Sequence, residues 1–71
     1  MNSLYDVKDY TKVNVRWNTC TQPYYDMTVE MGIECGNNIY LLRKYPNHVI
    51  IKVNQKEIVL SKDLAQQIKV V

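Results

Sequence analysis

The chain has 71 residues, a net charge of +2 and an apolar fraction of 46%. These values fit one domain, 1–71. They exclude a disordered chain, which would be less apolar, and a dedicated nucleic-acid binder, which would be more basic. A chain this short buries only about 60% of the surface that its unfolded form exposes, so it often needs a disulfide, a metal or a partner subunit.

The sequence carries no recognisable signal peptide or membrane span. Its apolar runs, such as residues 49–51, are far short of the roughly 20 residues that cross a bilayer. Its two cysteines are too few for a secreted disulfide scaffold. We therefore expect a cytoplasmic protein, in its own cell or in a host.

Residues 1–11 show no clear period and are predicted to form an irregular lead-in segment. The alternative is a short helical turn, because Ser3 and Asp6 have the spacing of a helix cap. In either form, the segment is available to cover part of the sheet that follows.

Residues 12–17 alternate strictly and predict the first strand. Val13, Val15 and Trp17 share one face, which is typical of a strand with one buried side. Residues 18–26 are polar and contain a proline, which has no backbone N–H to donate to a central strand, so we expect a loop there.

Four more strands are predicted, separated by turns rich in Gly, Asn and Pro. If residues 54–55 form a two-residue hairpin loop, Ile51 faces Ile58. In the same register Lys52 faces Glu57, so that opposite charges meet. The four strands cover residues 27–35, 39–44, 48–53 and 57–60.

The same register extends across the sheet. Three-residue loops at residues 36–38 and 45–47 place Leu41 opposite Ile51, and a slip of one residue would scramble the pattern. One face then collects Val29, Met31, Ile33, Ile39, Leu41, Val49, Ile51, Val53, Ile58 and Leu60.

Residues 61–71 change period and predict a C-terminal helix. Ser61 is a good N-cap, and Leu64 and Ile68 lie on one apolar stripe. The fold class is therefore α+β and mainly β. We expect a five-stranded antiparallel meander over residues 12–60, as an open curled sheet or a small barrel, followed by this short helix.

Three apolar residues fall on the face of the sheet that should be solvated. The predicted registers place Leu42 opposite Ile50, and Ile50 opposite Val59, so that they form a row. Gly32 lies beside this row and leaves room for a close neighbour. Two interpretations stay open: the C-terminal helix or the lead-in segment covers the row, or the row is open and docks a partner.

The composition favours docking. The aromatic residues are six Tyr and one Trp without Phe, and Tyr and Trp are enriched at interfaces. We therefore predict a small non-enzymatic protein-interaction module, a regulator, inhibitor or adaptor of the phage or mobile-element type, that binds a protein partner or a second copy of itself. The predicted partner-binding residues are Leu42, Ile50, Val59, Tyr40, Tyr24 and Tyr25.

The alternative is a nucleic-acid-binding sheet, in which an aromatic residue stacks on bases and cations neutralise phosphates. Its residues would be Arg16, Tyr40, Arg43, Lys44 and Lys52. Glu30, Glu34 and Glu57 are predicted on the same face, and they would cancel much of the field that drives such binding.

No catalytic, cofactor or metal site is predicted. A cysteine nucleophile would need His48 beside Cys20 or Cys35, and His48 has no obvious carboxylate to orient it. The same three residues lack the paired spacing of a zinc site. In the predicted hairpin the two cysteines lie about 26 Å apart, which is too far for a disulfide.

Overall fold

Six strands form one antiparallel sheet in the computed structural model, which describes residues 2–71. The strands are β1 (Asn2–Ser3), β2 (Thr11–Asn18), β3 (Asn38–Lys44), β4 (His48–Val53), β5 (Lys56–Ser61) and β6 (Ile68–Val70). Their order across the sheet is β1-β6-β2-β3-β4-β5. The predicted mainly β, antiparallel class is confirmed, with six strands in place of five.

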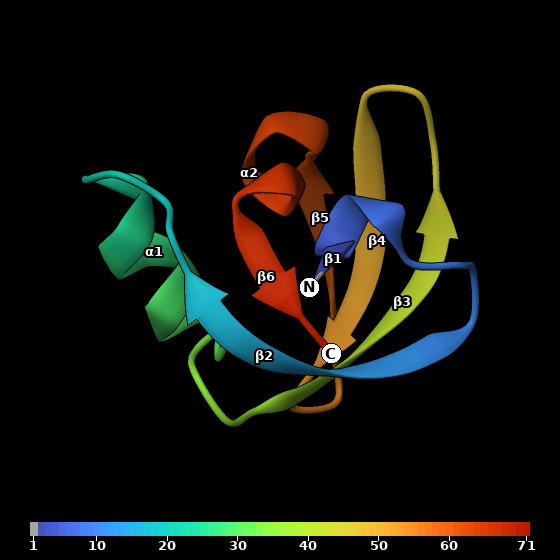
Figure 1. Ribbon diagram of the computed structural model, residues 1–71, viewed down its shortest axis with the longest axis horizontal. Coiled ribbons are helices and arrows are strands. Elements are labelled where there is room, and N and C mark those ends of the chain that lie inside the picture. Colours follow the sequence, from blue (N-terminus) through green and yellow to red (C-terminus); the bar gives the residue numbers. More distant parts are fainter. Residues whose placement is uncertain (1) are drawn as a thin grey trace.

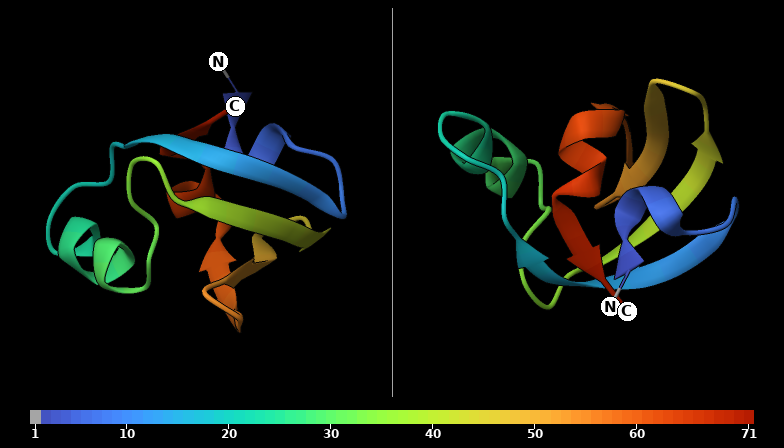
Figure 2. Two further views of the ribbon diagram at one scale, coloured as in Figure 1. Left: turned by 90° about the horizontal axis from the view of Figure 1, so that it is seen from below. Right: turned by 45° about the horizontal axis from the view of Figure 1, so that its top comes forward.

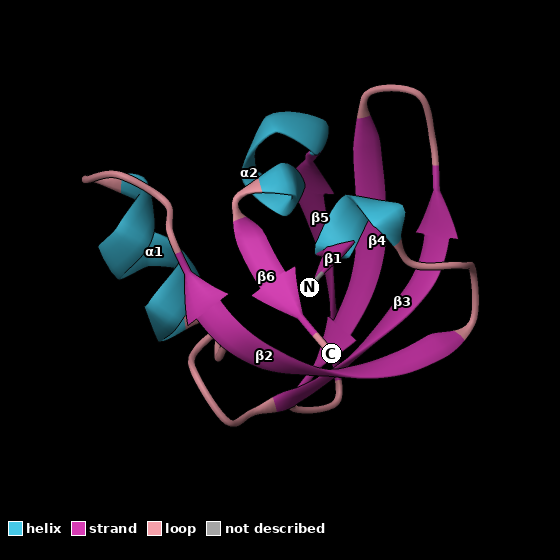
Figure 3. Cartoon of the chain, viewed as in Figure 1, coloured by secondary structure: helices cyan, strands magenta, loops and turns pink. Residues whose placement is uncertain are grey.

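Three short helices complete the described part of the chain: η1 (Leu4–Asp6), α1 (Tyr24–Glu30) and α2 (Lys62–Gln66). Figures 1 and 3 show η1 and α2 within the curl of the sheet, where α2 packs on η1, β4 and β5. In both views of Figure 2, α1 stands apart from the curl, beyond the end of β2.

The meander of β3, β4 and β5 follows the prediction. Ile51 pairs with Leu41 on one side and with Ile58 on the other, and Lys52 pairs with Glu57. The turn at residues 54–55 has two residues, both with positive φ (49° and 69°), as a type I′ turn requires. The alternation therefore sets the register, and this turn closes the hairpin.

The core lies on the inner face of the curl. Most apolar residues predicted for this face between residues 39 and 60 are buried there, and Ile58 packs against them while partly exposed. Each fully buried Val, Leu or Ile side chain contributes roughly 1.5–3 kcal/mol. The buried cluster is Leu4, Val7, Val13, Val15, Cys20, Ile33, Ile39, Leu41, Val49, Ile51, Val53, Leu60, Ala65, Ile68 and Val70.

The predicted strand over residues 27–35 is wrong. The chain forms α1 there and then an irregular loop, and β2 pairs directly with β3. Met27 and Met31 fit a helix face at i and i+4 as well as one face of a strand, so the alternation was ambiguous. Ile33 still reaches the core from the loop, while Met31 is half-buried.

Two register shifts correct the predicted faces. One lies between Val15 and Trp17 in the pairing of β2 with β6, and Trp17, predicted inside, is 58% exposed. The other lies between Leu41 and Arg43, so Arg43 is the partner of Ile50, and the predicted pairing of Leu42 with Ile50 is wrong. Such bulges insert an unpaired residue and re-aim the side chains that follow.

The C-terminal helix is shorter than predicted. Ser61 caps α2 by accepting a hydrogen bond from the backbone N–H of Leu64, as expected, but the helix ends at Gln66. The last residues form β6, which pairs with β1 and β2. Ile68 and Val70 are buried on either side of Lys69, which is the alternation of a strand.

The lead-in segment contains both predicted alternatives in part. The side chain of Asp6 accepts hydrogen bonds from the backbone N–H and the hydroxyl of Ser3, so the cap exists and starts the turn η1. β1 precedes it, and an irregular stretch follows it. Met1 lies outside the described residues.

Asn18, near the end of β2, fixes α1 and the loop that follows it. Its amide N–H₂ donates to the hydroxyl of Thr28 (2.7 Å) and to the carbonyl of Ile33 (2.9 Å). Its amide oxygen accepts from the backbone N–H of Cys20 (3.1 Å). Thr28 is fully buried, so the helix is held by a polar contact sheltered from water.

We expect Asn18→Ala to destabilise the protein by about 1–3 kcal/mol, because it removes the Asn18 donor from the buried carbonyl of Ile33. The Thr28 hydroxyl loses one bond and keeps those to the carbonyl oxygens of Tyr24 and Tyr25. Asn14→Ala on the same strand is the control: its amide bonds lie in an exposed setting, so the loss should stay below about 1 kcal/mol. Urea unfolding followed by circular dichroism measures both. Equal losses for the two variants would contradict this role of Asn18.

Candidate functional site

The outer face of the sheet carries a polar row across four strands. Lys12 on β2 lies opposite Tyr40 on β3, Tyr40 lies opposite Lys52 on β4, and Lys52 lies opposite Glu57 on β5. All four side chains are exposed, and Tyr40 presents 45% of its surface. The face therefore shows one aromatic ring between two lysines.

An apolar row lies beside the polar one. Ile50 pairs with Val59, as predicted, and Leu42 lies in the bulge next to Arg43. Leu42 and Ile50 are half-buried, Val59 is 66% exposed, and none of the three belongs to the core cluster.

The two segments that would cover this row in the first of the two interpretations lie on the other face. Leu4 of η1 and Ala65 of α2 are part of the core cluster, together with the inner-face residues of the strands. The lead-in segment and the C-terminal helix therefore fill the curl of the sheet and leave the outer face open.

Tyr24 and Tyr25 lie on α1 and not on the outer face. Tyr24 (48% exposed) lines a hollow of about 260 Å³ together with Ser61 and Leu64. One turn further along α1, Met27 faces Ile58 across a second hollow of about 420 Å³. We call these two hollows together the α1–β5 groove; each is lined by apolar and polar side chains, and neither is lined by Leu42, Ile50 or Val59.

The residues predicted for nucleic-acid binding divide into two groups. Arg16, Tyr40 and Lys52 are exposed, whereas Lys44 donates to the carbonyl oxygen of Tyr5 (2.7 Å) and lies over the Tyr5 ring. Arg43 is paired with Asp9, with 3.8 Å between Nε and Oδ2.

The predicted positions of two glutamates are wrong. Glu30 lies on α1 and Glu34 in the loop after it, because residues 27–35 do not form a strand. Glu57 remains on the outer face, opposite Lys52. This face is therefore more positive than the sequence pattern indicated.

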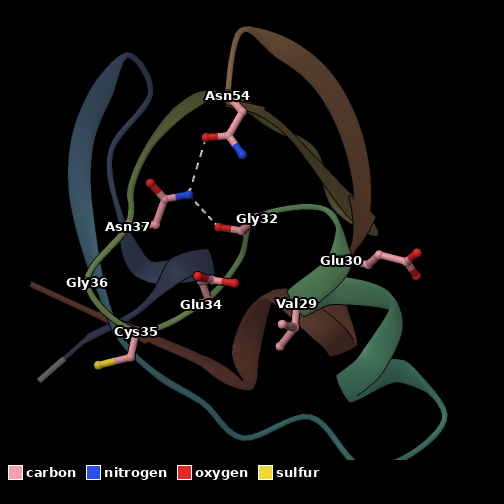
Figure 4. Close-up of a pocket in the computed structure, with 8 residues that line it drawn as sticks. All are labelled: Val29, Glu30, Gly32, Glu34, Cys35, Gly36, Asn37 and Asn54. Atoms are coloured by element: carbon pink, nitrogen blue, oxygen red, sulfur yellow. Dashed lines mark hydrogen bonds between the residues drawn. The ribbon is translucent and has the colours of Figure 1, made fainter.

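The loop after α1 packs on the turn between β4 and β5 (Figure 4). The side chain of Asn37 donates to the carbonyl oxygen of Gly32 (2.6 Å) and to Oδ1 of Asn54 (3.5 Å). The predicted position of Gly32 beside the row of Leu42 is wrong, because Gly32 lies in the loop after α1. Its close neighbour is the turn between β4 and β5: a Cβ on Gly32 would lie 2.6 Å from Nδ2 of Asn54.

The acidic and thiol side chains around this loop do not converge on one point. In Figure 4 the side chains of Glu30, Glu34 and Cys35 point in different directions. No group of three or more His, Cys, Asp or Glu side chains within residues 2–71 is arranged to hold a metal ion. The His48 ring stacks on Tyr45, and its Nδ1 lies 2.7 Å from the amide oxygen of Asn47.

The two cysteines are free and differ in environment. Cys20 is buried, and its thiol points toward the carbonyl oxygen of Leu64, with 3.9 Å between Sγ and O. Burial raises the pKa of the Cys20 thiol, although a hydrogen bond with Thr28 opposes this. Cys35 is exposed in the loop after α1, not on a strand as predicted.

A family model described as the FeoA domain matches residues 3–71. A search of curated proteins gave no match. Helices of the length and apolar character needed to cross a bilayer do not occur in residues 2–71.

Solved structures with the same fold cover nearly the whole chain. An iron uptake regulatory protein (FeoA) is 24% identical with a TM-score of 0.87, over 97% of this chain and 92% of the other. A FeoA-like protein from Clostridium acetobutylicum is 25% identical with a TM-score of 0.84, over 99% of this chain and 84% of the other. An iron(II) transport protein A from Clostridium thermocellum is 20% identical with a TM-score of 0.87, over 96% of this chain and 43% of the other.

We expect Gly32→Ala to be more harmful than Gly36→Ala. Both glycines have positive φ (100° and 92°), which costs an alanine about 1–3 kcal/mol at either position. A Cβ at Gly36 meets open space, whereas one at Gly32 meets Asn54 and Val53, so overpacking adds about 1–3 kcal/mol there. Chemical unfolding measures the difference, and equal losses would contradict the close packing at Gly32.

The two thiols should differ in their reaction with iodoacetamide at pH 8. Cys35 is exposed and should react first. Cys20 should react at least about tenfold more slowly, because its raised pKa lowers the thiolate fraction at a given pH and burial blocks access. Mass spectrometry of the labelled peptides follows each site, and denaturant should remove the difference. Equal native rates would show that Cys20 is not buried.

Proposed function

The chain belongs to the FeoA domain family, and on this premise we propose that it is a small non-enzymatic protein-interaction module that serves iron(II) transport. The names of two similar structures support a role in iron(II) transport: one is an iron uptake regulatory protein, and the other is an iron(II) transport protein A. The phage or mobile-element type finds no support in these comparisons. Iron(II) is in this proposal the cargo of the transport system, and the chain acts on a protein component of that system in the cytoplasm.

The open apolar row carries the docking proposal. Leu42, Ile50 and Val59 lie outside the core, on a face that η1 and α2 leave free. An exposed apolar patch with a rim of charges is typical of protein–protein interfaces. Tyr40, beside the row, supplies the kind of side chain that dominates binding energy at interfaces.

Tyr24 and Tyr25 belong to a second part of the proposed interface. They are 48% and 40% exposed on α1, and Met27 beside them is 39% exposed. Methionine adapts its shape to different partners, so the α1–β5 groove suits an apolar side chain of a partner protein.

A nucleic-acid-binding face is the second candidate function. The observation in its favour is that Glu30 and Glu34 lie away from the outer face. Salt separates the two candidates, because nucleic-acid affinity falls steeply as salt rises, whereas docking on an apolar row changes little.

The substitution Ile50→Asp tests the proposed interface, and Ile51→Asp is its matched control. Ile50 is half-buried on the outer face, so the variant should stay folded and bind the partner at least about tenfold more weakly. Ile51 is fully buried, so an unpaired charge there should cost about 3–5 kcal/mol and unfold a domain of this size.

The measurement combines circular dichroism with a pull-down from native extract, using the wild type and Ile50→Asp as baits. The expected result is a component of an iron(II) transport system that the wild type captures and the folded variant loses. A folded Ile50→Asp variant that retains this component would refute the interface. Sedimentation of the wild type checks the remaining alternative, a second copy of the chain as the partner.

A further inference from the structure

We propose that the outer face of β2 to β5 binds an acidic amphipathic helix of the partner protein. Two carboxylates of that helix would lie on Lys12 and Lys52, and an apolar side chain between them would lie over Tyr40. This inference rests on the proposed function and adds the chemistry of the partner.

The spacing of the two lysines determines how far apart the two carboxylates of the partner must lie. Lys12 and Lys52 are the register partners of Tyr40 on its two neighbouring strands. Because adjacent strands lie about 4.8 Å apart, the backbone positions of the two lysines are about 10 Å apart, with the tyrosine between them.

The charges of the row favour an acidic partner. In residues 2–71 the one ion pair is that of Arg43 with Asp9, so neither Lys12 nor Lys52 is neutralised by a carboxylate in contact. Glu57, opposite Lys52, is the one carboxylate of the row. The others lie on other elements or loops: Asp6, Asp9, Asp26, Glu30, Glu34 and Asp63.

A helix matches this spacing more closely than an extended peptide does. Residues seven apart in a helix lie about 10.5 Å apart on one face, and the third and fourth residues between them share that face. In an extended strand, same-face residues lie about 6.6 or 13 Å apart. Laid across the strands, the helix would place its intermediate apolar side chains over Tyr40 and beside Ile50 and Val59.

Two alanine-rich peptides of about 18 residues, long enough to be helical in part, serve as probes. One carries two glutamates seven positions apart with leucines at the third and fourth positions between them, and the other carries lysines in place of the glutamates. Affinity is measured by fluorescence anisotropy at low salt, and the contact surface by amide chemical shifts.

The glutamate peptide should bind the wild type about tenfold more tightly than the lysine peptide, with shifts centred on Lys12, Tyr40 and Lys52. The double variant Lys12→Glu/Lys52→Glu should reverse this preference. The control Lys8→Glu/Lys62→Glu makes the same change in net charge at lysines outside both the row and the α1–β5 groove and should leave the preference as it is.

Equal binding of the two peptides by the wild type, or a preference that the charge swap does not reverse, would overturn the inference. The proposed function would then depend on the Ile50→Asp result alone, which does not involve the lysines. Shifts centred on the α1–β5 groove would also overturn it. So would binding of single-stranded oligothymidylate more tightly than the glutamate peptide, which would assign the face to nucleic acid.

Discussion

The arrangement of both surfaces depends on the amide of Asn18. Between β2 and β3 the chain leaves the sheet, forms α1 and returns. Asn18 links both parts of this detour to β2, with bonds to the Thr28 hydroxyl on the helix and to the carbonyl of Ile33 on the returning loop. An unpaired buried group costs about 1–3 kcal/mol, a large share of the stability of a small domain. The Asn18 side chain therefore contributes to holding the detour against the end of β2, chiefly through the buried carbonyl of Ile33.

This detour determines what the outer face presents. Because α1 lies outside the sheet, β2 pairs with β3, and Lys12 becomes the neighbour of Tyr40. The same detour removes Glu30 and Glu34 from the face. A chain with a net charge of only +2 thus carries a face on which cations outnumber carboxylates, because the fold distributes the charges unevenly. The bulge at Leu42 brings Arg43 opposite Ile50, and the charge of Arg43 is paired with that of Asp9.

The sequence predicted the parts of the fold that local patterns determine. The hairpin of β4 and β5 follows from strict alternation and a two-residue turn, and the pairing of Ile50 with Val59 follows from that register. The helix α1 could not be separated from a strand, because Met27 and Met31 satisfy both periods over so few residues. The strand β6 was missed because it pairs with β1 and β2 from the far end of the chain, and such contacts leave no local pattern.

The candidate site was predictable to a similar degree. Ile50 and Val59 were placed on the second face of the sheet because their position depends on a register that the alternation determines, and whether that face is covered stayed open at that point. The contacts of Lys44 and Arg43 could not be predicted, because their partners Tyr5 and Asp9 lie in a segment that shows no periodic pattern. Trp17 and Leu42 were misplaced for a related reason: a bulge is one extra residue, and a pattern of alternation read from one strand alone does not reveal it.

The two proposed surfaces meet at the edge strand β5. Successive side chains of a strand point to opposite faces, so Val59 lies on the outer face while its neighbour Ile58 lines the α1–β5 groove. In the described sheet β5 has a neighbour on one side only, so no further strand separates the two surfaces. A partner that wraps round this edge therefore reaches both: its acidic helix contacts the lysine row, and one apolar side chain enters the groove beside Met27. Tyr40, Tyr24 and Tyr25 were assigned to one site from the sequence, and the fold places them on two surfaces. In this wrapped arrangement they contact the same partner.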